Sequence, residues 1–121
     1  MQTMNMAVPL PVGREAALRA LAAELAGPRQ AEFRAFLERL DTTEERWYLQ
    51  TIEGKPYCIV YLAAGDIAAA FGRLAASRHP FDIWIKEQNR QIFDIDFDAE
   101  MDGPVSENLF EYVVSYEGAR Q

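Results

Sequence analysis

The 121-residue sequence predicts one α+β domain in which helices cover one face of a four-stranded antiparallel sheet. Three observations lead to this prediction. Short apolar segments typical of strands occur near the N-terminus, in the middle and near the C-terminus. The segments between them repeat apolar residues at helical spacing. The resulting order is strand, helix, strand, strand, helix, strand, which is the βαββαβ order of a ferredoxin-like domain.

The N-terminal part of the chain predicts a strand followed by an interrupted helix. Apolar residues alternate with smaller or polar ones from Met4 to Leu10, as in a strand. Apolar residues then recur every three or four positions from Leu18 to Leu40, as on one face of a helix. Pro28 interrupts this repeat, because proline cannot donate a helical hydrogen bond. We therefore expect one long helix kinked at Pro28, or two nearly collinear helices.

A β-hairpin is predicted in the middle of the chain. Residues 46–52 and 57–62 are short segments rich in aromatic and β-branched residues. Residues 53–56 separate them and include a glycine and a proline, which are typical of turns. The two segments are expected to form antiparallel strands joined by a loop of about four residues.

Two helical segments follow the predicted hairpin. Asp66 is placed to cap the first of them, because an aspartate side chain accepts hydrogen bonds from free backbone N–H groups. Pro80 is placed in the first turn of the second, where its fixed φ suits a helix. Asp82 and Lys86 have the i, i+4 spacing of an exposed ion pair on this second helix.

Residues 98–121 are predicted to hold an acidic connection and the last strand, within a single domain that spans residues 1–121. The strand is expected at residues 109–116, which are rich in aromatic and β-branched residues. Acidic residues alternate with other residues in 94–102, but the glycine and glutamate of an EF-hand loop are missing. An acidic sheet edge that discourages edge-to-edge pairing is the better interpretation.

Composition excludes several classes of function. The formal net charge is −7 and the basic residues form no stripe, so we expect neither nucleic-acid binding nor attachment to an anionic membrane. The single cysteine, Cys58, cannot form a disulfide or a thiolate metal site within one chain. No signal peptide is visible, and no apolar segment approaches the ~20 residues that span a bilayer. The sequence predicts a soluble, cytoplasmic protein.

Apolar side chains on both faces of the predicted strands indicate a partner subunit. Helices can cover only one face of the sheet, and a face open to water would alternate apolar with polar residues. The strands at 57–62 and 109–116 do not alternate cleanly in this way. A large apolar face usually marks an interface, and the same face of a second copy is its simplest cover. We therefore expect a homodimer through the sheet face; the alternative is that the C-terminal tail covers it.

Two segments carry a resemblance to known proteins. Residues 25–30 (LAGPRQ) and 79–88 (HPFDIWIKEQ) are similar to a bacterial family of short proteins without assigned activity, and the similarity extends over nearly residues 4–97. This family resembles the dimeric α/β-barrel group, which includes antibiotic-biosynthesis and haem-degrading monooxygenases. The resemblance implies a ferredoxin-like dimeric α/β barrel, but it brings no catalytic residues. Residues 98–121 lie outside it.

Candidate ligand-binding residues are expected to line a pocket between the sheet and the helices. Small-molecule sites are mostly apolar with a few polar groups. Gln50 and Tyr61 place hydrogen-bonding groups on otherwise apolar strands. Arg29 lies in an apolar phase of its helix, where it would bind an anionic group or pair with Glu32. The complete set of predicted ligand-binding residues is Arg29, Trp47, Tyr48, Gln50, Phe81 and Trp84, although core packing explains Phe81 and Trp84 equally well.

His79 and Tyr61 are the candidate catalytic residues. His79 is the one histidine of the chain, and its unperturbed pKa near neutrality suits acid–base chemistry. The alternative is that His79 caps the helix that begins at Pro80. The sequence contains no nucleotide-binding loop, nucleophile elbow or zinc-protease motif, so we expect no cofactor and no metal.

Two hypotheses for function remain open. The leading one is a homodimeric domain that binds a small apolar or aromatic molecule, with cofactor-independent oxygenase or isomerase activity. The alternative is a non-catalytic structural or interaction module, whose aromatic residues build the core and the dimer interface.

Overall fold

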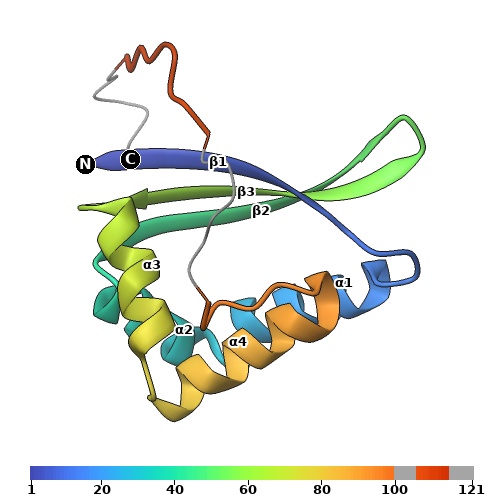
Figure 1. Cartoon of the computed structure of the whole chain (residues 1–121), viewed down its shortest axis with the longest axis horizontal. Coiled ribbons are helices and arrows are strands. Elements are labelled where there is room, and N and C mark those ends of the chain that lie inside the picture. Colours follow the sequence, from blue (N-terminus) through green and yellow to red (C-terminus); the bar gives the residue numbers. More distant parts are fainter. Residues whose placement is uncertain (100–105, 115–121) are drawn as a thin grey trace.

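The structure, a computed structural model, describes residues 1–99 and 106–114 (Figure 1). Within these residues, a three-stranded sheet forms one layer, and four helices lie against one of its faces. The α+β class predicted from the sequence is therefore confirmed. The elements in chain order are β1 (Gln2–Pro9), α1 (Glu15–Ala26), α2 (Gln30–Arg39), β2 (Thr42–Ile52), β3 (Lys55–Ala64), α3 (Ile67–Ala76) and α4 (Pro80–Phe93).

The sheet has the order β1-β3-β2, and both strand pairs are antiparallel. Side chains alternate between its two faces. The inner face packs against the helices, and the outer face has no helix over it in the described part of the chain (Figure 1). Register places three rows across the outer face, of which the central row is Ala7, Ile59 and Tyr48.

The hydrophobic core lies between the inner face and the helices. Met4 and Cys58 supply its sheet side and are 3% and 1% exposed. The helices contribute the remaining large buried side chains, because each presents one apolar stripe to the sheet. These are Leu18, Leu21, Leu25, Phe36, Ile67, Leu74, Phe81, Ile85 and Ile92.

The predicted fourth strand is not found in the described residues. Residues 106–114 have no regular secondary structure, and residues 115 and 116 of that prediction lie outside the described part. The Asn5 N–H on the open edge of β1 donates to the Oγ of Ser106 at 2.9 Å, and not to a neighbouring strand carbonyl. Leu109 is 84% exposed. The four-stranded ferredoxin-like arrangement is therefore not confirmed, because this segment forms no ladder with β1.

The predicted interruption at Pro28 is found, and it divides the segment into two separate helices. α1 ends at Ala26 and α2 begins at Gln30. The backbone N–H of Gly27 donates to the carbonyl of Glu24, and that of Gln30 to the carbonyl of Gly27. These three-residue spacings replace the four-residue spacing of an α-helix at the break.

Side-chain caps begin α3 and α4. The Oδ1 of Asp66 accepts a hydrogen bond from the backbone N–H of Ala69 at 2.9 Å, which confirms the predicted cap. Pro80 occupies the first turn of α4, as expected. The Nδ1 of His79 accepts a hydrogen bond from the backbone N–H of Phe81 at 3.2 Å, so His79 caps this helix. In the described residues, no helix has both the length and the apolar character needed to cross a membrane.

The predicted outward pairing of Asp82 with Lys86 is wrong. The two residues are 0% and 4% exposed. The carboxylate of Asp82 accepts hydrogen bonds from Arg39 and from Ser77, both at 2.5 Å. The Nζ of Lys86 donates to Asp98 at 2.6 Å and to the carbonyl of Ser77 at 3.0 Å. The spacing placed both charges on one face of α4, but that face points inward, where Arg39 of α2, Ser77 and Asp98 bind them.

The turn between β2 and β3 is tighter than predicted. Ile52 pairs directly with Lys55, so Glu53 and Gly54 form the loop by themselves. Their φ angles are 51° and 78°. Positive φ at both positions is the pattern of a type I′ turn, whose twist matches that of the flanking strands. The expected four-residue loop was too long because Pro56 belongs to the start of β3.

Replacement of two glycines by alanine is expected to change stability in opposite directions. Gly54 has a φ of +78°. Alanine is strained there, so Gly54→Ala should lower the free energy of unfolding by about 1 kcal/mol. Gly72 lies within α3, where an added Cβ meets nothing within 4 Å. Gly72→Ala should therefore raise that free energy by about 0.5–1 kcal/mol. Denaturant unfolding measures both, and a loss of stability in both variants would contradict the prediction.

Candidate functional site

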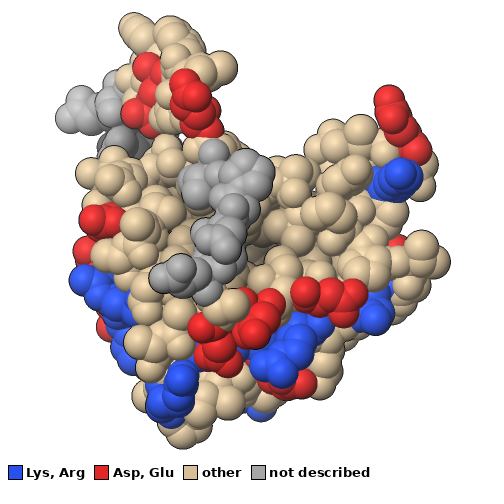
Figure 2. All heavy atoms as spheres, viewed as in Figure 1, with Lys and Arg blue, Asp and Glu red and all other residues tan. Residues whose placement is uncertain are grey.

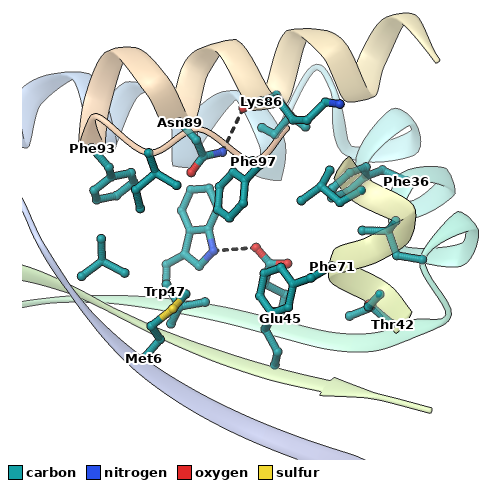
Figure 3. Close-up of a pocket in the computed structure, with 18 of the residues that line it drawn as sticks. Met6, Phe36, Thr42, Glu45, Trp47, Phe71, Lys86, Asn89, Phe93 and Phe97 are labelled. Atoms are coloured by element: carbon teal, nitrogen blue, oxygen red, sulfur yellow. Dashed lines mark hydrogen bonds between the residues drawn. The ribbon is translucent and has the colours of Figure 1, made fainter. Parts of the chain in front are cut away.

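The inner face of the sheet and the helices form the walls of a partly open cavity of about 90 Å³ (Figure 3). β1 contributes Met6 and Val8, and β3 contributes Cys58, Val60 and Leu62. Most of the remaining wall consists of apolar side chains from the helices and from the residues after α4. These are Phe33, Phe36, Leu40, Ile67, Ala70, Phe71, Leu74, Ile85, Phe93, Ile95 and Phe97.

A bulge in β2 brings the side chain of Thr42 to the same face as the carboxyl group of Glu45. Thr42 pairs with Ala64 and Glu44 with Ala63, so the register of β2 against β3 shifts by one residue between them. The shift changes the alternation of β2, because an extra residue reverses which side chains face inward. Thr42 and Glu45 consequently both line the cavity, and Trp47 follows Glu45 on the same face.

The carboxyl of Glu45 lies in an unusual environment. Its Oε2 accepts a hydrogen bond from the indole Nε1–H of Trp47 at 2.7 Å (Figure 3). Among the described residues, no ion pair includes Glu45. Burial raises the pKa of Glu45 to about 7, and the hydrogen bond from Trp47 opposes this only in part. Near neutral pH the cavity therefore holds a carboxyl that changes its charge.

A second, more open depression adjoins the cavity. It has a volume of about 280 Å³, and Ala22, Leu25 and Ala26 of α1 form one of its sides. Three residues line both spaces, namely Phe33, Glu45 and Trp47. These three side chains therefore separate the cavity from the open depression.

Two other polar side chains of the wall, from Lys86 and Asn89, are held by the protein itself. The Nζ of Lys86 is bound to Asp98 and to backbone carbonyls, so its aliphatic stem faces the cavity. The Nδ2 of Asn89 donates to the carbonyl of Ile85 at 2.9 Å, which fixes the amide at the helical wall (Figure 3).

Cys58 lines the cavity as a thiol. It is 1% exposed, and burial, followed by the negative charge of Glu45, raises the pKa of the thiol to about 11. The thiolate is the nucleophilic form of cysteine, so a raised pKa makes Cys58 unreactive at neutral pH.

Of the candidate strand residues, the structure brings Trp47 to the cavity. Tyr48, Gln50 and Tyr61 are not among the residues that line it. Tyr61 pairs with Arg46 and Tyr48 with Ile59, so these tips lie on the outer face of the sheet. Tyr48 and Gln50 alternate with Trp47 along β2, so they lie on the opposite face of the sheet from Trp47. The sequence alone could not say which of the two faces the helices cover.

The predicted ligand-binding residues on or next to the helices pack against one another. Phe81 is buried, and its ring centroid is 5.6 Å from that of Phe36 and 5.5 Å from that of Trp84. The guanidinium of Arg29 lies over the Trp84 ring, 4.0 Å from its centroid. Arg29 also pairs with Glu32, as the sequence suggested, and with Glu24 at 3.4 Å and 3.1 Å respectively.

The candidate catalytic residues are not brought together. His79 is an exposed cap at the start of α4, and Tyr61 lies on the outer face, so the sheet separates them. Neither lines the cavity. In residues 1–99 and 106–114, no group of three or more His, Cys, Asp or Glu is placed to hold a metal ion.

Glu45 is the site residue that sequence reasoning missed. The sequence predicts strand β2 over residues 46–52, where aromatic and β-branched residues are frequent. The structure begins it at Thr42. A signal was present, since Glu45, Trp47 and Leu49 share the period of two that marks one face of a strand.

Comparisons of the chain with protein-family models, with curated proteins and with solved structures found no match. No family assignment follows. The resemblance to the dimeric α/β-barrel group therefore stays a prediction from the sequence.

Proposed function

We propose that the protein binds a small apolar molecule in the cavity between the sheet and the helices. The observation that carries the proposal is a partly open cavity of about 90 Å³ with almost wholly apolar walls. Apolar cavities stay dry, and one of roughly 150 Å³ binds benzene. The cavity is smaller than that, so by itself it suits a short chain, and a single ring would extend past Trp47 into the open depression.

Support for binding is stronger than support for catalysis. Small-molecule sites combine apolar walls with a few placed polar groups, and here Glu45, Thr42 and Asn89 are those groups. Cofactor-independent oxygenase or isomerase activity stays a prediction, because its expected residues, His79 and Tyr61, lie outside the cavity. Location in the cytoplasm also stays a prediction from the sequence.

Toluene binding tests the cavity. Two variants, each with one alanine of α3 replaced by leucine, form a matched pair. Ala70 lines the cavity, whereas Ala68 is exposed on the same helix. Toluene should raise the Tm of the unmodified protein and of Ala68→Leu, because it binds the folded state alone. Ala70→Leu should abolish the rise by filling the space. Toluene binding that persists in Ala70→Leu would place it elsewhere, and no binding in any variant would favour the non-catalytic module.

We also propose that two copies pair through the outer face. Tyr57, Ile59 and Tyr61 are half-buried there without any helix over them, and Tyr48 is 56% exposed. Many charged side chains lie over the helix layer (Figure 2), whereas Arg46, which pairs with Tyr61, is a charged residue of the outer face. The known strand spacings give the face an area of roughly 400–500 Å², below the ~800 Å² per partner of a stable interface.

The exposed residues 109–114 would supply the additional apolar area that the proposed dimer interface needs. Leu109, Phe110, Tyr112, Val113 and Val114 are 50–84% exposed, and Ser106 already contacts the open edge of β1. A second copy that covers the outer face would bury these side chains as well. Pairing of residues 109–116 with a strand edge would complete the four-stranded, ferredoxin-like sheet of the predicted barrel.

Oligomeric state is the direct test of this pairing. The unmodified protein is expected to be a dimer in light scattering, and Ile59→Glu should make it a monomer by placing a charge in the centre of the face. Ile83→Glu is the control, since Ile83 is 48% exposed on α4 and lies in the helix layer. A monomeric unmodified protein, or a dimer that tolerates Ile59→Glu, would contradict the proposal.

A further inference from the structure

The two charged residues of the cavity wall, Lys86 and Glu45, differ in whether they have an ion-pair partner among the described residues. Lys86 is paired with Asp98 at 2.6 Å. Glu45 has no ion-pair partner in the part of the chain that the structure describes, and it accepts a hydrogen bond from Trp47. An ionised carboxylate has about four acceptor sites on two oxygens. Most of this capacity is therefore open to a ligand.

Aromatic rings surround this carboxyl. Glu45 points into the middle of the cavity, between Trp47 and Phe71, and Phe97 lies on the helix side (Figure 3). The rings of Phe71 and Phe97 are stacked with their centroids 6.2 Å apart. Aromatic faces carry partial negative charge and attract cations, most strongly in a site shielded from water.

We infer that the cavity binds the protonated amino group of a small apolar amine, with the carboxylate of Glu45 as its counter-ion. The inference rests on the proposed function, because it names the ligand class of the same cavity. Glu45 is half-buried among apolar side chains, where a carboxylate without a counter-ion is unfavourable, and an ammonium group supplies both the opposite charge and hydrogen-bond donors. The apolar walls take the ring or chain of the amine, and a ligand with a negative charge is repelled.

The other groups that face Glu45 leave its charge unmatched at neutral pH. Cys58 on β3 stays a neutral thiol, since its pKa is raised to about 11. Lys86 on α4 directs its charge to Asp98. The cavity-lining side chains of β1, α2 and α3 are all apolar. A charge change near pH 7 inside the cavity therefore belongs to Glu45, whose pKa is raised to about 7 by burial.

Binding of benzylamine, toluene and benzoate, measured by calorimetry at about pH 8, tests the inference. Benzylamine should bind about tenfold more tightly than toluene, the equivalent of one charge-assisted hydrogen bond, and benzoate should not bind. Glu45→Gln should remove the preference for benzylamine and keep toluene binding. Glu44→Gln should keep the preference, because Glu44 precedes it on β2 but pairs with Arg46 outside the cavity.

The pH dependence of the unmodified protein provides a test that needs no variant. Benzylamine stays protonated below about pH 9, so its affinity should rise from about pH 6 to about pH 8 as Glu45 ionises. Toluene affinity should not change in this way. A pH-independent affinity for benzylamine would overturn the inference.

The possible outcomes separate this inference from the proposed function. If toluene binds and benzylamine binds no tighter, or if Glu45→Gln keeps the preference, the amine is not the ligand class and the cavity proposal stands. If neither compound binds, the proposed function itself fails. The Tm of Glu45→Gln should exceed that of the unmodified protein increasingly from about pH 5 to about pH 8, because the raised pKa makes ionised Glu45 destabilising. This rise also verifies that the variant is folded.

Discussion

Asp82→Ala is expected to lower the free energy of unfolding by about 3 kcal/mol at neutral pH. The carboxylate is 0% exposed and accepts hydrogen bonds from Arg39 on α2 and from Ser77 after α3. Its removal leaves the guanidinium of Arg39 without a counter-ion in a site that is 31% exposed. Breaking a buried pair from one side is more costly than its net contribution suggests, since the remaining charge stays desolvated. Equilibrium unfolding in denaturant measures the loss.

The exposed pair between Arg34 and Glu38 on α2 is the matched control. Its side chains are 84% and 67% exposed. Glu38→Ala should therefore lower stability by about 0.3–0.5 kcal/mol, as for other exposed i, i+4 pairs. A similar, small loss in Asp82→Ala would contradict the assignment of Asp82 as a buried link between α2 and α4.

Lowering the pH should reduce the loss of stability that Asp82→Ala causes. Burial raises the pKa of the Asp82 carboxyl, but hydrogen bonds from Arg39 and Ser77, with the charges of Arg39 and His79, hold it below its usual range. A lowered pKa means that the stabilisation is fully present above the ordinary carboxyl pKa of about 4 and is lost as pH falls through the folded-state pKa. The difference in stability between the unmodified protein and Asp82→Ala should accordingly narrow below about pH 4.

Phe81→Ala is the second substitution with a large expected effect, a loss of about 3–5 kcal/mol. Phe81 is 3% exposed at the start of α4. Its ring packs between Phe36 of α2 and Trp84, with centroids 5.6 Å and 5.5 Å away. Alanine would leave a void between the rings of Phe36 and Trp84, and the surrounding helices could fill it only in part. Denaturant unfolding at constant pH measures the loss.

Ile83→Ala on the same helix is the control for Phe81→Ala. Ile83 is 48% exposed, so its truncation should cost less than about 1 kcal/mol. Equal losses in the two variants would contradict the predicted orientation of α4. Phe81→Ala should also leave toluene binding intact in the folded fraction, because Phe81 does not line the cavity.

The order of the elements from β1 to α4 could be predicted because each rests on local chemistry. Asp66 and Pro80 mark the starts of two helices through a side-chain acceptor and a fixed φ, and neither depends on distant residues. Pro28 marks a break for the same reason. The turn at Glu53 and Gly54 was predicted in place but not in length, since the left-handed φ of a glutamate has no reliable sequence signal.

The inner face and its carboxyl could not be predicted, because both depend on tertiary contacts. Glu45 lies on the same strand face as Trp47, but the sequence does not say which face the helices cover, and a one-residue bulge after Thr42 decides that Thr42 joins them on that face. No local sequence pattern predicts such a bulge. The same limitation applies to Asp82 and Lys86, whose spacing indicated a shared face but not the partners that bury it.

The predicted last strand shows that a sequence pattern can indicate a strand conformation without indicating which strand it pairs with. Residues 109–114 have the composition of a strand, yet the described structure gives them no ladder. Strand propensity reflects packing on a sheet more than an intrinsic backbone preference. The prediction of a fourth strand therefore needs an edge to receive it, either in the same chain or in a second copy.

The uncovered outer face also has a consequence for ionic strength. The chain carries a formal charge of −7, and two copies repel each other as they approach. Any contact through Ile59 and its aromatic neighbours would gain little from ion pairs, because it is mainly apolar. Dissolved salt screens the repulsion over about 10 Å at 0.1 M and leaves the apolar attraction in place. Self-association of this protein should therefore strengthen as salt is added, the opposite of what an interface built on ion pairs would do.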